Sequence, residues 1–324
     1  MIARRRWLAQ ALCAGIAPET FAQITNARLG WLSVIARREL HERLRSWFSD
    51  QMRRHDWIEG RNLAMEMRGG VTGTPLAVAA AELVALKPDA LLAGGTASVE
   101  LLANLTKEIP IVMIGAADPV GSGFAASLAR PGGNITGVSS NQDDLWSKVP
   151  GLIHEWVPRA RRIDLLADAA NPINTRFSRA TAEAARSRGL TSQLLAVRSS
   201  QELEPAIAGT PADALLMSSD PMFFPHLERM AAAARRRSLP TIMTGGLARE
   251  GAAAGLLCSY DANAEDVVRR AADCTDRILR GARPAELPIE QPTRYTYVIN
   301  LKTARAIGVA IPKGHLLRAD EVVE

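Results

Sequence analysis

Five histidines are the side chains in this sequence that most often serve as general bases or metal ligands. They lie far apart, four of them in segments predicted to be helical, and none has the spacing of a metal site such as HExxH: His41, His55, His154, His226 and His315. The chain also contains no GxSxG nucleophile elbow and no Walker phosphate-binding loop. The sequence therefore predicts a protein that is not an enzyme and that carries no metal or other cofactor.

A glycine-rich stretch from Gly121 to Ala126 (GSGFAA) matches the letters of the dinucleotide-binding pattern GxGxxA. That pattern binds a pyrophosphate when it directly follows the first strand of a parallel sheet and opens a helix. Here it follows a fourth predicted strand, Ile111 to Ile114, with Asp118, Pro119 and Val120 in between. Its position in the chain therefore argues against a nucleotide site.

Polar loops at the ends of predicted strands are the remaining candidates for chemistry. In open α/β sheets, ligands bind beyond the carboxyl ends of the strands, where loop side chains and helix N-termini hold small polar groups. The stretch from Ile111 to Gly137 is an example, because its buried strand closes at Gly115 and Asp118 follows. The candidate ligand-binding residues in such loops and in the polar segment between the two halves are Ser33, Arg37, Arg38, Gly95, Thr96, Ala117, Asp118, Asn141, Asn171, Asn174, Asp220, Thr244 and Tyr260.

Each candidate also has a purely structural interpretation. Gly95 and Thr96 form a suitable carboxylate receptor at a helix start, or a tight turn that Thr96 caps. Asp118 could hold the ammonium group of a ligand, or cap the turn at Pro119. For the others the structural alternatives are helix caps at Asn171 and Asn174, a core position for Tyr260, and solvent-facing rather than anion-binding side chains at Arg37 and Arg38.

Hydrophobic periodicity indicates the elements that position these loops. Apolar runs predict strands at 28–35, 90–93 and 111–114, and alternation predicts one at 63–67. Helical patterns predict helices at 39–55, 76–86 and 97–106. This succession requires a parallel sheet with right-handed crossovers. After a polar pause at 139–144 the same alternation starts again and continues to residue 280.

The predicted fold class is therefore α/β, with two Rossmann-like lobes, each a parallel sheet flanked by helices. A chain of 324 residues is long enough for two domains. The expected division is an N-terminal lobe at 23–140, a C-terminal lobe at 141–290 and a return segment at 291–324 that crosses the hinge.

The amino terminus has the pattern of an export signal. Arg4, Arg5 and Arg6 precede a mostly apolar run at 7–17, and Thr20-Phe21-Ala22 approaches a cleavage site. Because the run is too short for a membrane span, we predict a signal peptide at 1–22 and a periplasmic location. The arginines also resemble a twin-arginine signal, and an ordinary N-terminal helix is the alternative.

Charge and cysteine content indicate no further partner. The net charge of +5 comes from basic residues that are interleaved with acids, and no helix-turn-helix precedes the first strand, so we expect no nucleic-acid binding. Cys13 lies in the presumed signal, behind a poor lipobox. Cys258 and Cys274 are expected to be two buried thiols rather than a disulfide.

Several strings resemble one family over nearly the whole chain after the signal. Ala117 to Gly121 (ADPVG), Leu128 to Gly137 (LARPGGNITG) and Val298 to Ala304 (VINLKTA) are similar to the ABC-transporter substrate-binding proteins related to tryptophan/tyrosine-binding lipoproteins. The resemblance implies a type I periplasmic-binding-protein fold with the ligand between the lobes. The chain departs from the family in its basic segment Ser33 to Arg38 and at Asp261, where glycine is frequent.

The resemblance implies an exported, monomeric protein that captures a small polar solute, an amino acid or an organic acid. The lobes would close on it around a hinge near 139–145 and 281–300, and the protein would deliver it to an ABC permease in the inner membrane. The alternative is a sensor of the same fold that signals to a partner. A small hydrolase or transferase is a weaker alternative.

Overall fold

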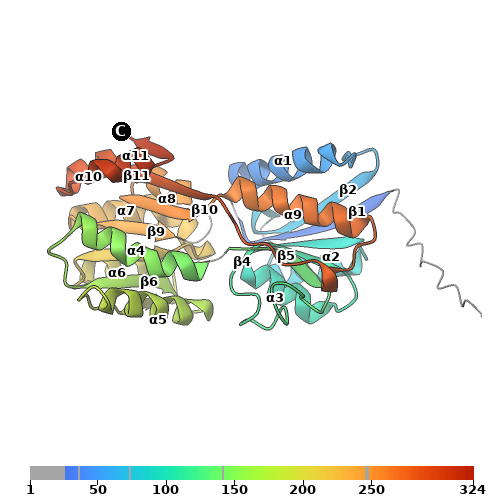
Figure 1. Cartoon of the computed structure of the whole chain (residues 1–324), viewed down its shortest axis with the longest axis horizontal. Coiled ribbons are helices and arrows are strands. Elements are labelled where there is room, and N and C mark those ends of the chain that lie inside the picture. The colour runs from blue at the N-terminus through green and yellow to red at the C-terminus, as the bar shows by residue number, and fades with distance from the viewer. Residues whose placement is uncertain (1–25, 36, 73, 141, 245–247) are drawn as a thin grey trace, which may run out of the picture.

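The protein has two α/β lobes that lie side by side along its long axis (Figure 1). A computed structural model describes residues 26–35, 37–72, 74–140, 142–244 and 248–324. The presumed export signal and Asn141 therefore lie outside the described residues. No helix in these ranges is long and apolar enough to cross a membrane.

The first lobe is built on a five-stranded parallel sheet in the order β2-β1-β3-β4-β5. Its inner strands β1, β3 and β4 are short, mostly apolar runs because helices cover both faces of the sheet, whereas the edge strand β2 contains Glu66 and Arg68. Most residues of the three strands β3, β4 and β5 are buried. The strand bounds are β1 Ala27–Ser33, β2 Leu63–Gly69, β3 Ala90–Gly94, β4 Ile111–Ala116 and β5 Ile135–Ser139.

Two pairs of helices cover this sheet. On one face, α1 (Arg38–Arg54) buries Leu44, Phe48 and Met52, which recur at helical spacing, in a core shared with Trp31. On the other face, α2 (Leu76–Ala85) and α3 (Thr96–Leu105) bury small and branched side chains against the sheet, after the short 3₁₀ turn η1 (Gly70–Thr72). The partner of α1 comes from much later in the chain.

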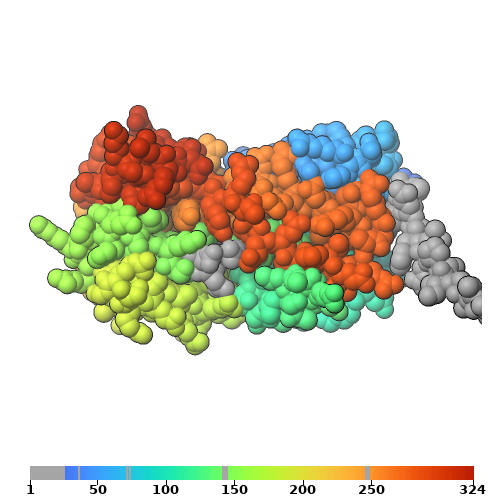
Figure 2. Space-filling model, in the orientation of Figure 1, coloured from blue at the N-terminus to red at the C-terminus, as the bar shows by residue number. Residues whose placement is uncertain are grey.

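That partner is α9 (Ala264–Leu279), which packs beside α1 and shares its apolar core through Val267, Val268 and Ala271. Figure 2 shows the orange surface of this part of the chain next to the blue surface of α1. The sequence suggested that residues up to 290 would form the C-terminal lobe, whereas α9 covers the first. Its helical periodicity identifies an apolar face, but cannot say which sheet that face will cover.

The second lobe contains a seven-stranded sheet in the order β12-β11-β10-β9-β8-β6-β7. Only the pair β10 and β11 is antiparallel among the described pairs of this sheet. The late strand β11 thus returns to the second lobe. The strand bounds are β6 Ile163–Asp168, β7 Leu194–Val197, β8 Ala214–Ser218, β9 Thr241–Thr244, β10 Cys258–Ala262, β11 Tyr295–Asn300 and β12 Glu321–Val323.

Helices also cover both faces of this sheet. One core contains side chains of α4 and α5, and the other contains side chains of α6 and α7. Cys258 and Cys274 are buried free thiols. The helix bounds are α4 Gln142–Trp156, α5 Ile173–Arg186, α6 Leu203–Gly209, α7 Leu227–Arg236, α8 Ala248–Ala253, α10 Leu301–Ile307 and α11 Lys313–Arg318, with 3₁₀ turns η2 Pro221–His226 and η3 Pro284–Glu286.

The chain passes between the lobes at three places in the described ranges: from β5 to α4, from β10 to α9, and from η3 to β11. The first and third lie where the sequence predicts a hinge. At the third, Glu290 runs beside β5, since its N–H donates to the Gly137 carbonyl at 2.8 Å and its carbonyl accepts from the Ser139 N–H at 2.9 Å.

Candidate functional site

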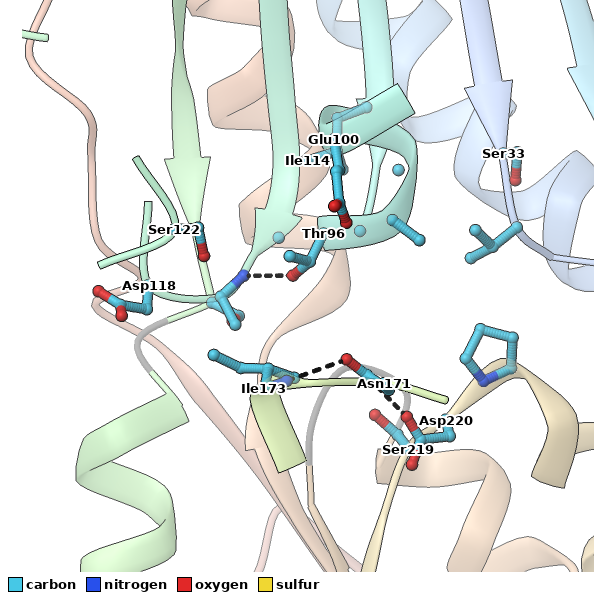
Figure 3. Close-up of a pocket in the computed structure, with 18 of the residues that line it drawn as sticks. Ser33, Thr96, Glu100, Ile114, Asp118, Ser122, Asn171, Ile173, Ser219 and Asp220 are labelled. Atoms are coloured by element: carbon cyan, nitrogen blue, oxygen red, sulfur yellow. Dashed lines mark hydrogen bonds between the residues drawn. The ribbon is translucent and has the colours of Figure 1, made fainter. Parts of the chain in front are cut away.

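A cavity of about 1110 Å³ lies between the lobes, at the carboxyl ends of strands from both sheets. In Figure 3, residues of the first lobe such as Thr96 and Asp118 lie above it, and Asn171 and Asp220 of the second lobe lie below it. The predicted site residues that line this cavity are Ser33, Gly95, Thr96, Ala117, Asp118, Asn171, Asn174 and Asp220. We call it the interlobe cleft.

Thr96 ties together two loops of the upper wall. Gly95, with φ of 79°, makes the turn from β3 into α3 in a conformation that favours glycine. The hydroxyl of Thr96 then accepts a hydrogen bond from the N–H of Ala117 at 2.9 Å, as drawn in Figure 3. This bond fixes the loop after β4 against the start of α3, so the two loops form one surface.

Asp118 caps its own turn and also contacts the opposite lobe. Its φ of 38° lies in the left-handed region, which aspartate tolerates better than most residues. One carboxylate oxygen accepts from the Gly121 N–H at 2.9 Å, and the other forms an ion pair with Arg176 of α5. The turn-cap interpretation of Asp118 is therefore observed, together with a charge contact across the cleft.

Asp220 organises the lower wall. It is 2% exposed, and its carboxylate accepts from the Asp168 N–H at 2.9 Å and from the side-chain amides of Asn171 and Asn174 at 2.7 and 2.9 Å. The Ser218 hydroxyl also donates to it. Asn171 additionally accepts from the Ile173 N–H at the start of α5, at 3.4 Å (Figure 3). Four donors hold this buried charge, so the network is a rigid part of the wall.

The other predicted residues that the structure describes, Arg37, Arg38, Thr244 and Tyr260, are not among those that line the interlobe cleft. Arg37 forms an ion pair with Glu250 of the second lobe at 2.7 Å, and Arg38 is exposed at the start of α1. Thr244 is buried at the end of β9. Tyr260 packs its ring against Tyr295 and Tyr297, with ring centroids 5.9 and 5.4 Å away, a packing position like the core alternative considered for it.

Sequence reasoning missed Arg176, whose guanidinium reaches the cleft from the first turns of α5. One signal could have found it: Arg176 lies just after the polar loop that contains Asn171, where a side chain of a following helix can still face the ligand. The aromatic residues Phe124, Phe177 and Phe224, which also line the cleft, were missed because they resemble core residues in the sequence. No metal site of three or more His, Cys, Asp or Glu side chains exists among the residues that the structure describes.

The chain is similar to known proteins in both sequence and fold. Residues 40–323 match the family described as "ABC transporter substrate binding protein". A tyrosine-binding protein of Clostridioides difficile is 23% identical over 254 residues, which cover 77% of this chain and 72% of that protein.

Two solved structures show the same fold. An ABC domain of Streptococcus pneumoniae in complex with L-Trp has a TM-score of 0.84 at 22% identity, and the match covers 92% of this chain and 100% of that one. The ligand-free, open structure of a substrate-binding protein with adhesive properties from Clostridium difficile has a TM-score of 0.68 at 20% identity, covering 92% and 99%.

These similarities confirm the family resemblance and the predicted fold class, two α/β lobes arranged as in type I periplasmic binding proteins. They also agree with the lack of catalytic motifs, because the matched family consists of substrate-binding proteins and not of enzymes. The chain belongs to the ABC transporter substrate-binding protein family, and it is the solute-binding component of such a transporter.

Proposed function

We propose that this protein binds an amino acid in the interlobe cleft and delivers it to the permease of an ABC transporter. The observation that carries the proposal is the cavity of about 1110 Å³ between the lobes, lined by loops at the carboxyl ends of strands in both sheets. That position is where α/β folds bind ligands, and the volume is at the upper end of ordinary small-molecule sites.

Three further observations support a small polar ligand. Two of the relatives named above point to amino acids, one as a tyrosine-binding protein and the other as a complex with L-Trp. The walls combine polar loops with the rings of Phe124, Phe177 and Phe224, as suits a ligand with both charged and apolar parts. Two buried polar atoms of lining residues, Ser140 Oγ and Asn174 Oδ1, have no hydrogen-bond partner among the described residues, and buried polar atoms normally have one.

The test is calorimetry of the protein, freed of any ligand that co-purifies, against the common L-amino acids and a set of organic acids. We expect at least one amino acid to bind with a Kd of about 10 μM or tighter, which corresponds to a binding free energy of about −7 kcal/mol. A folded protein that binds none of these compounds would contradict the proposal.

A matched pair of variants places the binding site. Ala97 is exposed at the start of α3 and lines the cleft, so the ring of Ala97→Trp should obstruct part of it and weaken binding. Ala81, exposed on α2 and outside the cavity lining, is the control, and Ala81→Trp should bind like the parent. Equal binding by both variants would place the site elsewhere.

Export and transport need a cellular test. We propose that residues 1–22 direct the chain to the periplasm, where it acts as a monomer, and that changing Arg4 and Arg5 to lysine blocks export if the twin-arginine route is used. Deleting the gene should abolish uptake of the bound amino acid. A protein that binds this amino acid but is not needed for its uptake would instead favour the sensor function.

A further inference from the structure

We propose that Arg176 and Asp118 are the two halves of a site for a zwitterion, in which the Arg176 guanidinium binds the carboxylate of the ligand and the Asp118 carboxylate binds its ammonium group. The proposal rests on the proposed function, which it narrows to free α-amino acids. It makes Arg176 a specificity-determining residue.

The pair joins the two lobes across the interlobe cleft. Asp118 extends from the loop after β4 in the first lobe, and Arg176 from α5 in the second, and both line the cavity. Gly121 leaves space for the contact, since a Cβ at this position would lie 2.7 Å from Arg176 Nη1 and would overlap the Asp118 carboxylate. The chain thus has a glycine where a side chain would require the ion pair to shift.

The other charged residues of the lining are poor candidates for holding a ligand. Asp220 already accepts from four donors, and Asp168 accepts from the Ala170 N–H at 2.8 Å. Glu100 and Lys107 lie at exposed positions of α3 and just after it. Asp118 and Arg176 are therefore the opposite charges that face each other between the lobes.

An ion pair of this kind selects a ligand that carries both charges. A molecule with only a carboxylate would pair with Arg176 and leave Asp118, whose side chain is 13% exposed, without its partner. A molecule with only an ammonium group would take Asp118 from Arg176 without offering the guanidinium a carboxylate in exchange. An uncompensated charge in a closed site is costly, whereas a zwitterion replaces both contacts at once.

The two residues are held differently. The Gly121 N–H holds the Asp118 carboxylate in its turn, while the Arg176 side chain is 46% exposed. Asp118 therefore offers a preformed ammonium site, and Arg176 moves to bind the carboxylate with its planar, two-pronged donor group.

The test compares one amino acid with its own fragments. For the L-amino acid that binds most tightly in the panel, the probes are its carboxamide, which keeps the ammonium group, and its des-amino acid, which keeps the carboxylate. The carboxamide and the des-amino acid should each bind the parent protein at least about 30-fold more weakly than the amino acid. Each of them can compensate only one of the two charges, Asp118 or Arg176. This arm needs no variant and so does not depend on the folding of one.

Variants then assign each charge to its residue. Arg176→Gln should weaken the amino acid about 30-fold or more but change the carboxamide by less than about threefold. Asp118→Asn should also weaken binding of the amino acid about 30-fold or more, but it should change binding of the des-amino acid by less than about threefold. Arg179→Gln, on the same helix, exposed and outside the lining, is the matched control and should leave all three affinities unchanged.

The outcomes separate the two proposals. If no compound of the panel binds, the proposed function and this inference both fail. If the tightest ligand is an organic acid that lacks the ammonium group, the zwitterion site is wrong and the proposed amino-acid function is weakened as well. If an amino acid binds but Arg176→Gln weakens amino acid and carboxamide equally, the function stands and the zwitterion site is wrong, because the ion pair then acts only as a contact between the lobes.

Discussion

Asp118 and Asp220 are two carboxylates of one cleft with different roles, and their surroundings explain the difference. Asp118 is held by one N–H and by an arginine with a half-exposed side chain. Asp220 is enclosed by four donors and has no comparable freedom. We therefore expect Asp118 to affect ligand binding and Asp220 to affect folding as well.

Removing the Asp220 carboxylate should destabilise the protein strongly. Asp220→Ala leaves the Asp168 N–H and the Asn171 amide without this acceptor, while Asn174 and Ser218 keep their bonds to the Asp168 and Leu166 carbonyls. We expect the free energy of unfolding to fall by about 2–4 kcal/mol. Urea unfolding followed by circular dichroism measures this. Asp50→Ala is the control, because Asp50 forms an exposed ion pair with Arg53 on α1 and should cost less than about 0.5 kcal/mol. Equal losses in the two variants would contradict a structural role for Asp220.

Cys274 gives a prediction about alkaline pH. Burial raises the pKa of its thiol from about 9 to about 11, so the folded protein keeps a proton that the unfolded chain releases. The resulting stability is fully present below pH 9 and is lost as the pH rises through 11.

The comparison that tests this is unfolding of the parent protein and of Cys274→Ser at two pH values. Between pH 8 and pH 10 the parent should lose about 1 kcal/mol more stability than the variant, which has no thiol to titrate at this position. Parallel pH profiles would show that Cys274 is not protected. Other groups that titrate at alkaline pH, including Cys258, are present in both proteins. Their effects cancel when the stability loss of the variant is subtracted from that of the parent.

At the residue scale, the sequence could predict the loops of the cleft but not the partners of their side chains. Thr96 and Asn171 follow strands, and sequence alone can place such residues at one edge of a sheet. Arg37 has the same kind of position, yet its charge is taken up by Glu250, which is 213 residues away. Contacts at such separations depend on how two lobes meet, and local patterns do not contain that information.

At the scale of elements, hydrophobic runs predicted most strands because parallel strands are buried on both faces. The expected strands at 90–93 and 111–114 correspond to β3 (Ala90–Gly94) and β4 (Ile111–Ala116). The pattern could not assign α9 to the first lobe, since its buried Val267, Val268 and Ala271 would suit a helix on either sheet. It also left open where β11 would pair, because alternation identifies a strand but not its neighbour.

The segment that leads from α9 back to the second lobe is held by Glu290. Its carboxylate pairs with Arg270 at 3.0 Å and with Arg277 at 2.9 Å, both on α9, while its backbone bonds to the edge of β5. Glu290→Gln should lower the free energy of unfolding by only about 1 kcal/mol, because the ion pairs are partly exposed. It should nevertheless speed hydrogen exchange at the amides of Ser139 and Glu290 that join this segment to β5.

The control for this prediction is Glu286→Gln. Glu286 lies on the same segment, and its contact with Arg283 is long, at 3.8 Å, and largely exposed. The variant Glu286→Gln should change neither the free energy of unfolding nor the exchange rates of the Ser139 and Glu290 amides. If both variants leave the exchange of Ser139 unchanged, the backbone pairing alone holds this connection.

For the whole molecule, the structure has the lobes in contact at two edges of the cleft. Asp118 and Arg176 meet at one edge, and at another Glu250 of α8 lies between Arg37 and Arg43 of the first lobe, 2.7 Å from each. Beside Glu250, apolar residues of both lobes, including Ile35 and Phe224, border one small pocket. These contacts exist only when the lobes are together, so they favour the closed form over an open one.

Glu250 should therefore affect closure more than folding. Glu250→Gln removes the charge between two arginines, and we expect the protein without ligand to shift toward an open form with a larger radius of gyration in small-angle X-ray scattering. With saturating ligand the variant should match the parent, because ligand contacts then hold the lobes together. The affinity of the variant for its ligand should fall by about fivefold, because a partly exposed ion pair contributes about 1 kcal/mol to closure.

Glu204 provides the matched control for closure. It also lies between two arginines, Arg229 at 2.6 Å and Arg236 at 3.5 Å, but all three residues are in the second lobe. Glu204→Gln should therefore change neither the scattering nor the affinity. High salt should reproduce the effect of Glu250→Gln on the parent, since it screens exposed ion pairs. If Glu250→Gln and Glu204→Gln scatter alike without ligand, the apolar contacts and Asp118 with Arg176 are sufficient to close the lobes, and Glu250 only neutralises its two neighbours.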